Sequence, residues 1–185
     1  MYRTKIKYFV PAFALVAAIT LATQLSSASN SVDRNGPELP AQCVSIDVAD
    51  TEKLAFHTYA RGVQIYKWNA TTFTWDFDAP RASLFAEPGY FGEVGSHYRG
   101  PTWESKSGSR VKAARVPGTG CTPDPTAIAW LLLRKVSSEG PGIFDRVTFI
   151  QRVNTAGGLP PSGPGPFLGA EEEVPYTAEY YFYRG

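Results

Sequence analysis

The stretch that decides the fold class is Gly62–Phe77, GVQIYKWNATTFTWDF. Its first half alternates between two faces of an extended chain, with Val63 and Ile65 on one face and Gln64, Tyr66 and Trp68 on the other. Its second half is predicted to point three aromatic residues inward: Phe73, Trp75 and Phe77. Asn69-Ala70, between the two halves, is typical of a turn. Two alternating runs joined by a short connection predict a β-hairpin.

Similar patterns recur along the chain and indicate seven to nine strands, with further runs at Leu54–Ala60, Ser109–Val116, Ala127–Leu133, Arg146–Val153 and Val174–Tyr183. Ala127–Leu133 is continuously apolar, which favours a strand buried on both faces, with a short buried helix as the alternative. Glycines and prolines punctuate the connections, predicted at Pro88–Pro101, Pro117–Thr126 and Gly157–Gly169. We therefore expect a mainly β, single-domain antiparallel β-sandwich or barrel with long Gly/Pro-rich loops.

The N-terminus has the pattern of a signal peptide. Three basic residues precede the apolar run Phe9–Ala22, and small residues up to Ala28 suit a cleavage site. The run is too short for a typical membrane-spanning helix, so an uncleaved anchor is the weaker alternative. We expect a signal peptide at 1–28, a mobile lead-in at 29–50, one β-rich domain at 51–185 and no later transmembrane span. The mature protein is expected to be secreted or periplasmic.

Charge and cysteine content narrow the classes of partner. Cleavage after Ala28 removes three basic residues and no acidic ones, which leaves 15 basic and 17 acidic side chains. A nearly neutral chain gives no electrostatic basis for binding nucleic acid. Cys43 and Cys121 are the only cysteines, and export would put them where disulfides persist. We predict that they are bridged, with two free buried thiols as the alternative.

Five stretches in order resemble the domain of unknown function 3455 family of exported bacterial and fungal proteins: GVQIY at Gly62–Tyr66, HYRGPTWE at His97–Glu104, IAWLLL at Ile128–Leu133, IQRVNTAGG at Ile150–Gly158, and VPYTAEYYFY at Val174–Tyr183. The resemblance implies an exported domain and no established activity. It also implies a cysteine after the QIY stretch and another after the Pro-rich loop. This chain has Trp68 at the first position and no cysteine in Ser162–Gly169 for the second. Dehydrogenase-like names occur among relatives, but GTGCTP at Gly118–Pro123 lacks the third glycine of a dinucleotide-binding loop.

The candidate ligand site is a group of aromatic and polar residues around Gly100-Pro101: His97, Tyr98, Trp103 and Glu104. Aromatic rings beside polar groups on a loop are a common way to hold sugars or small planar ligands. The alternative is that Tyr98 and Trp103 only pin a long loop to the sheet. No catalytic residue, metal site or cofactor is predicted, because no nucleophile elbow or ligand spacing accompanies the two histidines, His57 and His97.

The sequence therefore predicts a non-enzymatic domain that binds an unknown small molecule, glycan or protein, or that serves as a structural envelope protein. The alternative function is a secreted hydrolase that uses His97 or the loop carboxylates Glu87, Glu93 and Glu104.

Overall fold

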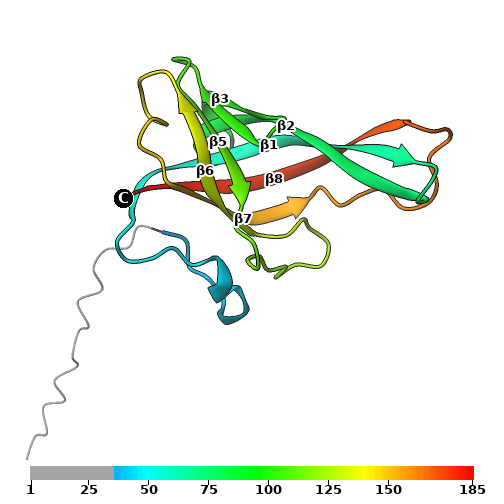
Figure 1. The fold of residues 1–185 in the computed structure, drawn as a ribbon, viewed down its shortest axis with the longest axis horizontal. Helices are drawn as coiled ribbons and strands as arrows, with labels where there is room; N and C mark the ends of the chain where they lie inside the picture. Colours follow the sequence, from blue (N-terminus) through cyan, green and yellow to red (C-terminus); the bar gives the residue numbers. More distant parts are fainter. Residues whose placement is uncertain (1–35) are drawn as a thin grey trace, which may run out of the picture. The chain divides into compact units, whose positions relative to one another are not determined.

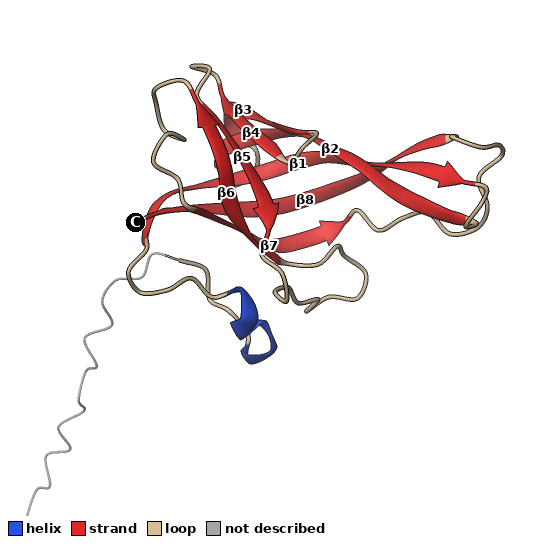
Figure 2. Cartoon of the chain, viewed as in Figure 1, coloured by secondary structure: helices blue, strands red, loops and turns tan. Residues whose placement is uncertain are grey.

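The computed structural model describes residues 36–185, which form one antiparallel sheet of eight strands. The strands are β1 Lys53–Asn69, β2 Thr74–Glu87, β3 Phe91–Tyr98, β4 Thr102–Ser105, β5 Arg110–Arg115, β6 Leu131–Glu139, β7 Phe149–Gly157 and β8 Glu171–Arg184. Each strand pairs with the next, and β8 pairs with β1 to close the sheet into a barrel (Figures 1 and 2). The predicted mainly β, antiparallel single domain is confirmed, in its barrel form.

The predicted hairpin is confirmed as β1–β2, but the facing of its second half is partly wrong. Trp68 pairs with Trp75 and Asn69 with Thr74, so both strands reach the turn in register. Phe73 lies in the turn itself and is 77% exposed, while Phe77 is 53% exposed. The sequence predicted both to point into a core. Phe77 does face the same side as Tyr66, but the hairpin there extends past β3 and has no barrel wall opposite it.

Two further segments differ from the sequence prediction. Pro88–Pro101 was expected to be a glycine-rich loop, yet it contains all of β3. Gly95 suits that strand because a Cβ there would lie 2.2 Å from the Glu104 carbonyl oxygen on β4, so only glycine allows the two backbones to approach this closely. In Ala127–Leu133 the strand begins only at Leu131, and Trp130 forms an isolated bridge with Cys121 instead.

The barrel interior is filled by side chains and centres on Trp103, which is 1% exposed. Its indole contacts the rings of Tyr180 and Phe182, with centroids 5.4 and 6.2 Å away. Alanines on four strands make room for these rings: Ala60, Ala82, Ala113 and Ala178. Small barrels are commonly filled in this way, by large side chains packed against small ones.

Residues 36–50 pack on the outside of the barrel. The 3₁₀-helix η1, Ala41–Ile46, buries Cys43 and Ile46 completely. Cys43 is disulfide-bonded to Cys121, as predicted, and its cluster includes Leu132 on β6 and Val153 on β7. The signal peptide expected at 1–28 lies outside the described residues, and the mobility of the lead-in stays a prediction. Residues 36–185 contain no helix with the length and apolar character that a membrane crossing requires.

Three strands continue beyond the barrel and form a projection that we call the arm: residues 63–69 of β1, 74–81 of β2 and 171–175 of β8. Pairing of β2 with β3 begins only at Ala82, and pairing of β7 with β8 ends at Tyr176. The arm lies at the right of the domain in Figure 1. The loop 158–169 leads from β7 to β8 along it (Figure 2).

Candidate functional site

One face of the arm is aromatic. Tyr66 and Trp68 lie two positions apart on β1, so their side chains share this face. Their cross-strand neighbours continue it, because Trp68 meets Trp75 with ring centroids 5.5 Å apart and Tyr66 meets Phe77 at 5.8 Å. Edge-to-face pairs of this kind contribute about 0.5–1.5 kcal/mol each beyond simple burial. The two ring pairs therefore make the aromatic face a fixed surface.

The loop 158–169 covers part of this aromatic face. The Tyr66 hydroxyl donates a hydrogen bond of 2.6 Å to the Gly158 carbonyl oxygen, and Trp75 Nε1 donates one of 3.0 Å to the Gly163 carbonyl oxygen. A Cβ on Gly165 would lie 2.5 Å from Trp68 Cβ, so the loop backbone runs directly against the indole. The loop is therefore held over the arm at three points, although five prolines and glycines between 160 and 165 prevent it from joining the sheet.

Between the loop and the hairpin turn lies an open groove of about 550 Å³, lined by Trp68, Phe73, Thr74, Trp75, Pro160, Pro161, Gly163 and Pro164. Its lining is mostly apolar, and its volume falls in the range of small-ligand sites, about 300–1,000 Å³. Phe73 forms one wall with a backbone φ of 54°, in the left-handed region. A bulky side chain rarely adopts this conformation, which costs of order 1–3 kcal/mol.

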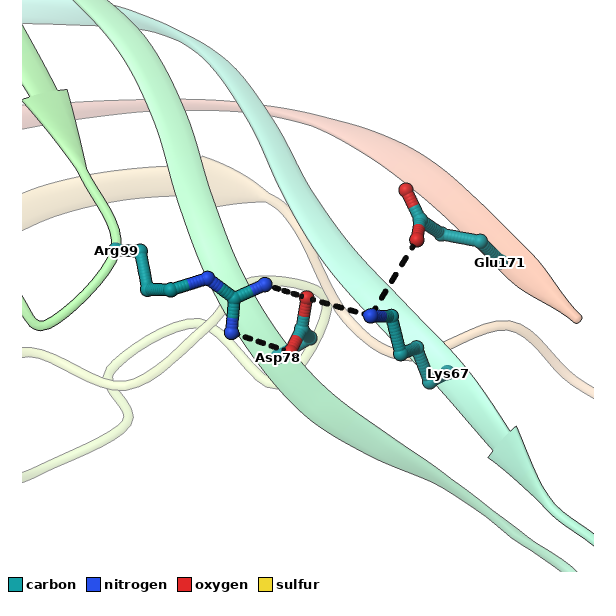
Figure 3. A network of polar contacts seen from close by, with 4 residues as sticks. All are labelled: Lys67, Asp78, Arg99 and Glu171. Carbon is teal, nitrogen blue, oxygen red and sulfur yellow. Dashed lines mark hydrogen bonds and ion pairs between the residues drawn. The ribbon is translucent and has the colours of Figure 1, made fainter. Parts of the chain in front are cut away.

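The opposite face of the arm is charged, as Figure 3 shows. Arg99, from the turn between β3 and β4, binds both carboxylate oxygens of Asp78 on β2. Lys67 Nζ lies 3.4 Å from Asp78 and 3.7 Å from Glu171 on β8. The hydrogen bonds from Arg99 hold the pKa of Asp78 below its usual value. This network connects the arm to the barrel. It lies on the face of the arm opposite to the aromatic side chains.

The residues predicted as a ligand site lie on β3 and β4, on two sides of the barrel wall. His97 and Trp103 are cross-strand neighbours that point inward and stack, with ring centroids 4.2 Å apart. Both are buried, at 3% and 1% exposure. Tyr98 and Glu104 point outward, and the Tyr98 hydroxyl donates a 2.6 Å hydrogen bond to Glu104 Oε2. The structure therefore brings the four residues together as two separate pairs.

His97 is a neutral, enclosed side chain in this structure. Its Nδ1 lies 2.9 Å from the Thr102 carbonyl oxygen, and its ring packs edge-on against Tyr180 at 5.1 Å. Burial lowers the pKa of His97 to about 3, and the positive charge of Arg152 contributes in the same direction. A proton on this ring at neutral pH would place a charge in the barrel core, which is strongly unfavourable.

Two of the carboxylates considered for hydrolysis have cationic partners. Glu104 also lies 3.8 Å from Arg110, and Glu93 lies 3.7 Å from Lys106. Among residues 36–185, no three His, Cys, Asp or Glu side chains come close enough to hold a metal ion.

The other histidine, His57, lies on the outer face of β1. Its Nε2 is 3.0 Å from Glu179 Oε2 on β8, and its ring stacks on Tyr181 at 4.1 Å. The contact with His57 is the main cause that lowers the pKa of Glu179. The arrangement is that of a cross-strand pair on a sheet, as the sequence indicated for this residue.

Together these observations define a class: a closed, eight-stranded antiparallel barrel that carries an aromatic groove on a projecting arm. The model of the family described as "Protein of unknown function (DUF3455)" matches residues 49–184, and the chain belongs to this family. No curated protein and no solved structure matches the chain. Trp68, the first position where the family resemblance implies a cysteine, packs against Gly165, which lies in the Ser162–Gly169 stretch that has no cysteine for the second.

Sequence reasoning missed the groove. A turn confined to Asn69-Ala70 places Trp68 opposite Thr71, whereas the observed turn spans residues 70–73 and pairs Trp68 with Trp75. The Pro-rich segment by itself predicts only a loop, because nothing local in the sequence shows that Gly165 packs on Trp68, 97 residues earlier in the chain.

Proposed function

We propose that this protein is an exported, non-enzymatic binding protein whose site is the arm groove beside Phe73 and Trp75. The observation that carries the proposal is Phe73 itself. It is a large apolar residue, 77% exposed, in a left-handed turn position that Asn or Gly would occupy without strain. Strain of this kind concentrates at ligand sites. The aromatic and proline walls and the 550 Å³ volume suit a ligand with a flat apolar surface.

Two observations favour binding over hydrolysis. The imidazole of His97, the proposed base of the hydrolase alternative, is stacked inside the barrel and has a pKa lowered to about 3. Glu104, a carboxylate on the strand that pairs with that of His97, accepts a hydrogen bond from Tyr98. Both groups are thus engaged by the protein's own side chains. The groove walls, in contrast, present rings and pyrrolidines that no other part of the described chain covers completely.

Export is supported by two independent features. The first 28 residues have the basic, apolar and small-residue order of a signal peptide. The Cys43–Cys121 disulfide is of the kind that persists in oxidising compartments. A binding protein outside the cytoplasm is consistent with both.

The proposal is tested with the neutral apolar dye N-phenyl-1-naphthylamine, whose fluorescence rises on binding, and with two substitutions at Phe73 and Phe91. Phe73→Asn removes one groove wall and relieves the left-handed strain, so we expect dye affinity to fall at least tenfold while the melting temperature stays equal or rises. Phe91→Asn is the control, because Phe91 is 71% exposed on β3 away from the groove. Equal loss of dye affinity in both variants, or in neither, would contradict the proposal.

A further inference from the structure

The arm leaves part of β2 without a second neighbour. Within residues 36–185, Thr74–Arg81 pairs with β1 on one side, apart from a register shift that skips Asp78. No strand in this part of the chain pairs with it on the other side, because β3 begins to pair only at Ala82. The exposed part of this edge is Thr74–Asp78, since Ala79 and Pro80 are buried. Pro80 also lacks an N–H group to donate, so it ends the usable edge. Five residues of strand span about 17 Å.

Unpaired edges accept further strands unless something blocks them. Along this one, Trp75 and Phe77 project to the aromatic face, and Thr74, Asp76 and Asp78 alternate with them. Phe77 is 53% exposed, and its ring contacts that of Tyr66. A strand added to this edge would set every second side chain directly beside Trp75 and Phe77, where cross-strand packing stabilises sheets. The aromatic face would then be covered on its open side.

The carboxylates along this edge of β2 determine which side chains an added strand should carry. Asp76 and Asp78 lie on the face opposite the rings, so the intervening residues of an added strand would meet carboxylates. Asp78 is already bound by Arg99 from the β3–β4 turn and by Lys67, whereas Asp76 accepts hydrogen bonds from the neutral groups of Asn69 and Thr74. Asp76 is therefore the carboxylate that a basic side chain of an added strand would meet. A second copy of β2 suits the edge poorly, because antiparallel pairing centred on Phe77 would put Asp76 opposite Asp78. Like charges in that position are destabilising.

We infer that the ligand of the arm is an extended polypeptide segment that adds to β2 at Thr74–Asp78, with apolar side chains against Trp75 and Phe77 alternating with basic ones on the face of Asp76. This inference rests on the proposed binding function and names its ligand class. Backbone hydrogen bonds to the edge would supply affinity, and the alternation of side chains would supply specificity.

The test uses a fluorescein-labelled seven-residue peptide of alternating lysine and valine, measured by fluorescence anisotropy at low salt. Two control peptides separate the contributions: one replaces lysine with glutamate, and the other carries an N-methyl group on every residue, which blocks strand pairing through either edge. We expect each control to bind at least tenfold more weakly than the parent. The Phe77→Arg variant should weaken the parent at least tenfold, whereas Phe91→Arg, at a second exposed ring on β3, should leave it unchanged.

Hydrogen exchange then reports the mode of binding. Addition of a strand should protect alternate backbone amides within residues 74–78 and no comparable set in β3. Absence of parent-peptide binding, equal binding of the N-methylated peptide, or binding without this protection would each overturn the inference. If the dye binds in a Phe73-dependent way and the peptide does not bind, the proposed function stands and the inference fails. If neither binds, both fail.

Discussion

Removal of the Cys43–Cys121 disulfide should cost this domain a large part of its stability. The bridge joins residues 78 positions apart, so it closes a long loop in the unfolded chain. In the chain-entropy model a loop of this length corresponds to about 4.5 kcal/mol at 25 °C. Native domains are stabilised by only about 5–15 kcal/mol, so the loss is a substantial fraction of the total.

The assay is urea unfolding of the oxidised protein, the reduced protein and the Cys43→Ala/Cys121→Ala variant, followed by tryptophan fluorescence. With an m-value of about 2 kcal/mol/M, the midpoint should fall by about 2 M. Cys43 is fully buried beside Ile46, so the alanine variant should lie slightly below the reduced protein.

Two results would refute this reasoning. The first is a midpoint that does not change on reduction, which would mean that the bridge does not constrain the unfolded chain as calculated. The second is a separate early transition, reported by labelling of the thiols, with the barrel transition unchanged. That outcome would show that η1 and the barrel do not unfold as one cooperative unit.

Two further predictions concern the barrel. Gly62→Ala should destabilise the protein by about 3 kcal/mol, because the new Cβ would lie 2.1 Å from the Arg81 carbonyl oxygen and overpacking costs typically 1–3 kcal/mol. Gly118→Ala is the control, because Gly118 has a positive φ but open space around it. An equal loss in the thermal or urea midpoint of both variants would contradict the steric argument. The pKa of His97 is about 3 in the folded protein, below its value of about 6.5 in the unfolded chain. Between these two pH values the unfolded chain binds a proton that the folded protein does not. The free energy of unfolding should therefore fall as the pH drops from about 6.5 toward 3, by up to about 1.4 kcal/mol per pH unit. Glu179, whose pKa is also lowered, acts in the same direction near its own titration, so His97→Gln should flatten specifically the part of the profile between pH 6.5 and 4.5. An unchanged profile would mean that the pKa of His97 is not lowered in the folded protein.

The fold could be predicted from the sequence to the extent that alternation is local. The pattern of Gly62–Trp68 and that of Val174–Tyr183 each reveal a strand, and the short connection at Asn69-Ala70 reveals a hairpin. Closure of the sheet could not be predicted, because it depends on the pairing of β1 with β8 across more than 100 residues. A sandwich and a barrel contain the same alternating runs.

The orientation of side chains was predicted less well than the strands. Alternation shows which residues share a face, but it does not show which face is enclosed. Phe77 and Trp103 have similar surroundings in sequence, yet one faces solvent on the arm and the other fills the barrel. The difference arises from where β3 begins to pair with β2. The candidate ligand site shows the same limit, since His97 and Tyr98 are neighbours in sequence and lie on opposite sides of the wall.

The pairing of β8 with β1 also sets the time at which this protein can fold. The interior needs Tyr180 and Phe182, which arrive only with the last of the eight strands. A partly synthesised chain therefore lacks a complete apolar interior. The entropy cost of closing the loop between β1 and β8 also still opposes its folding. Such a chain cannot close the ring until the final strand, β8, is free to pair with β1.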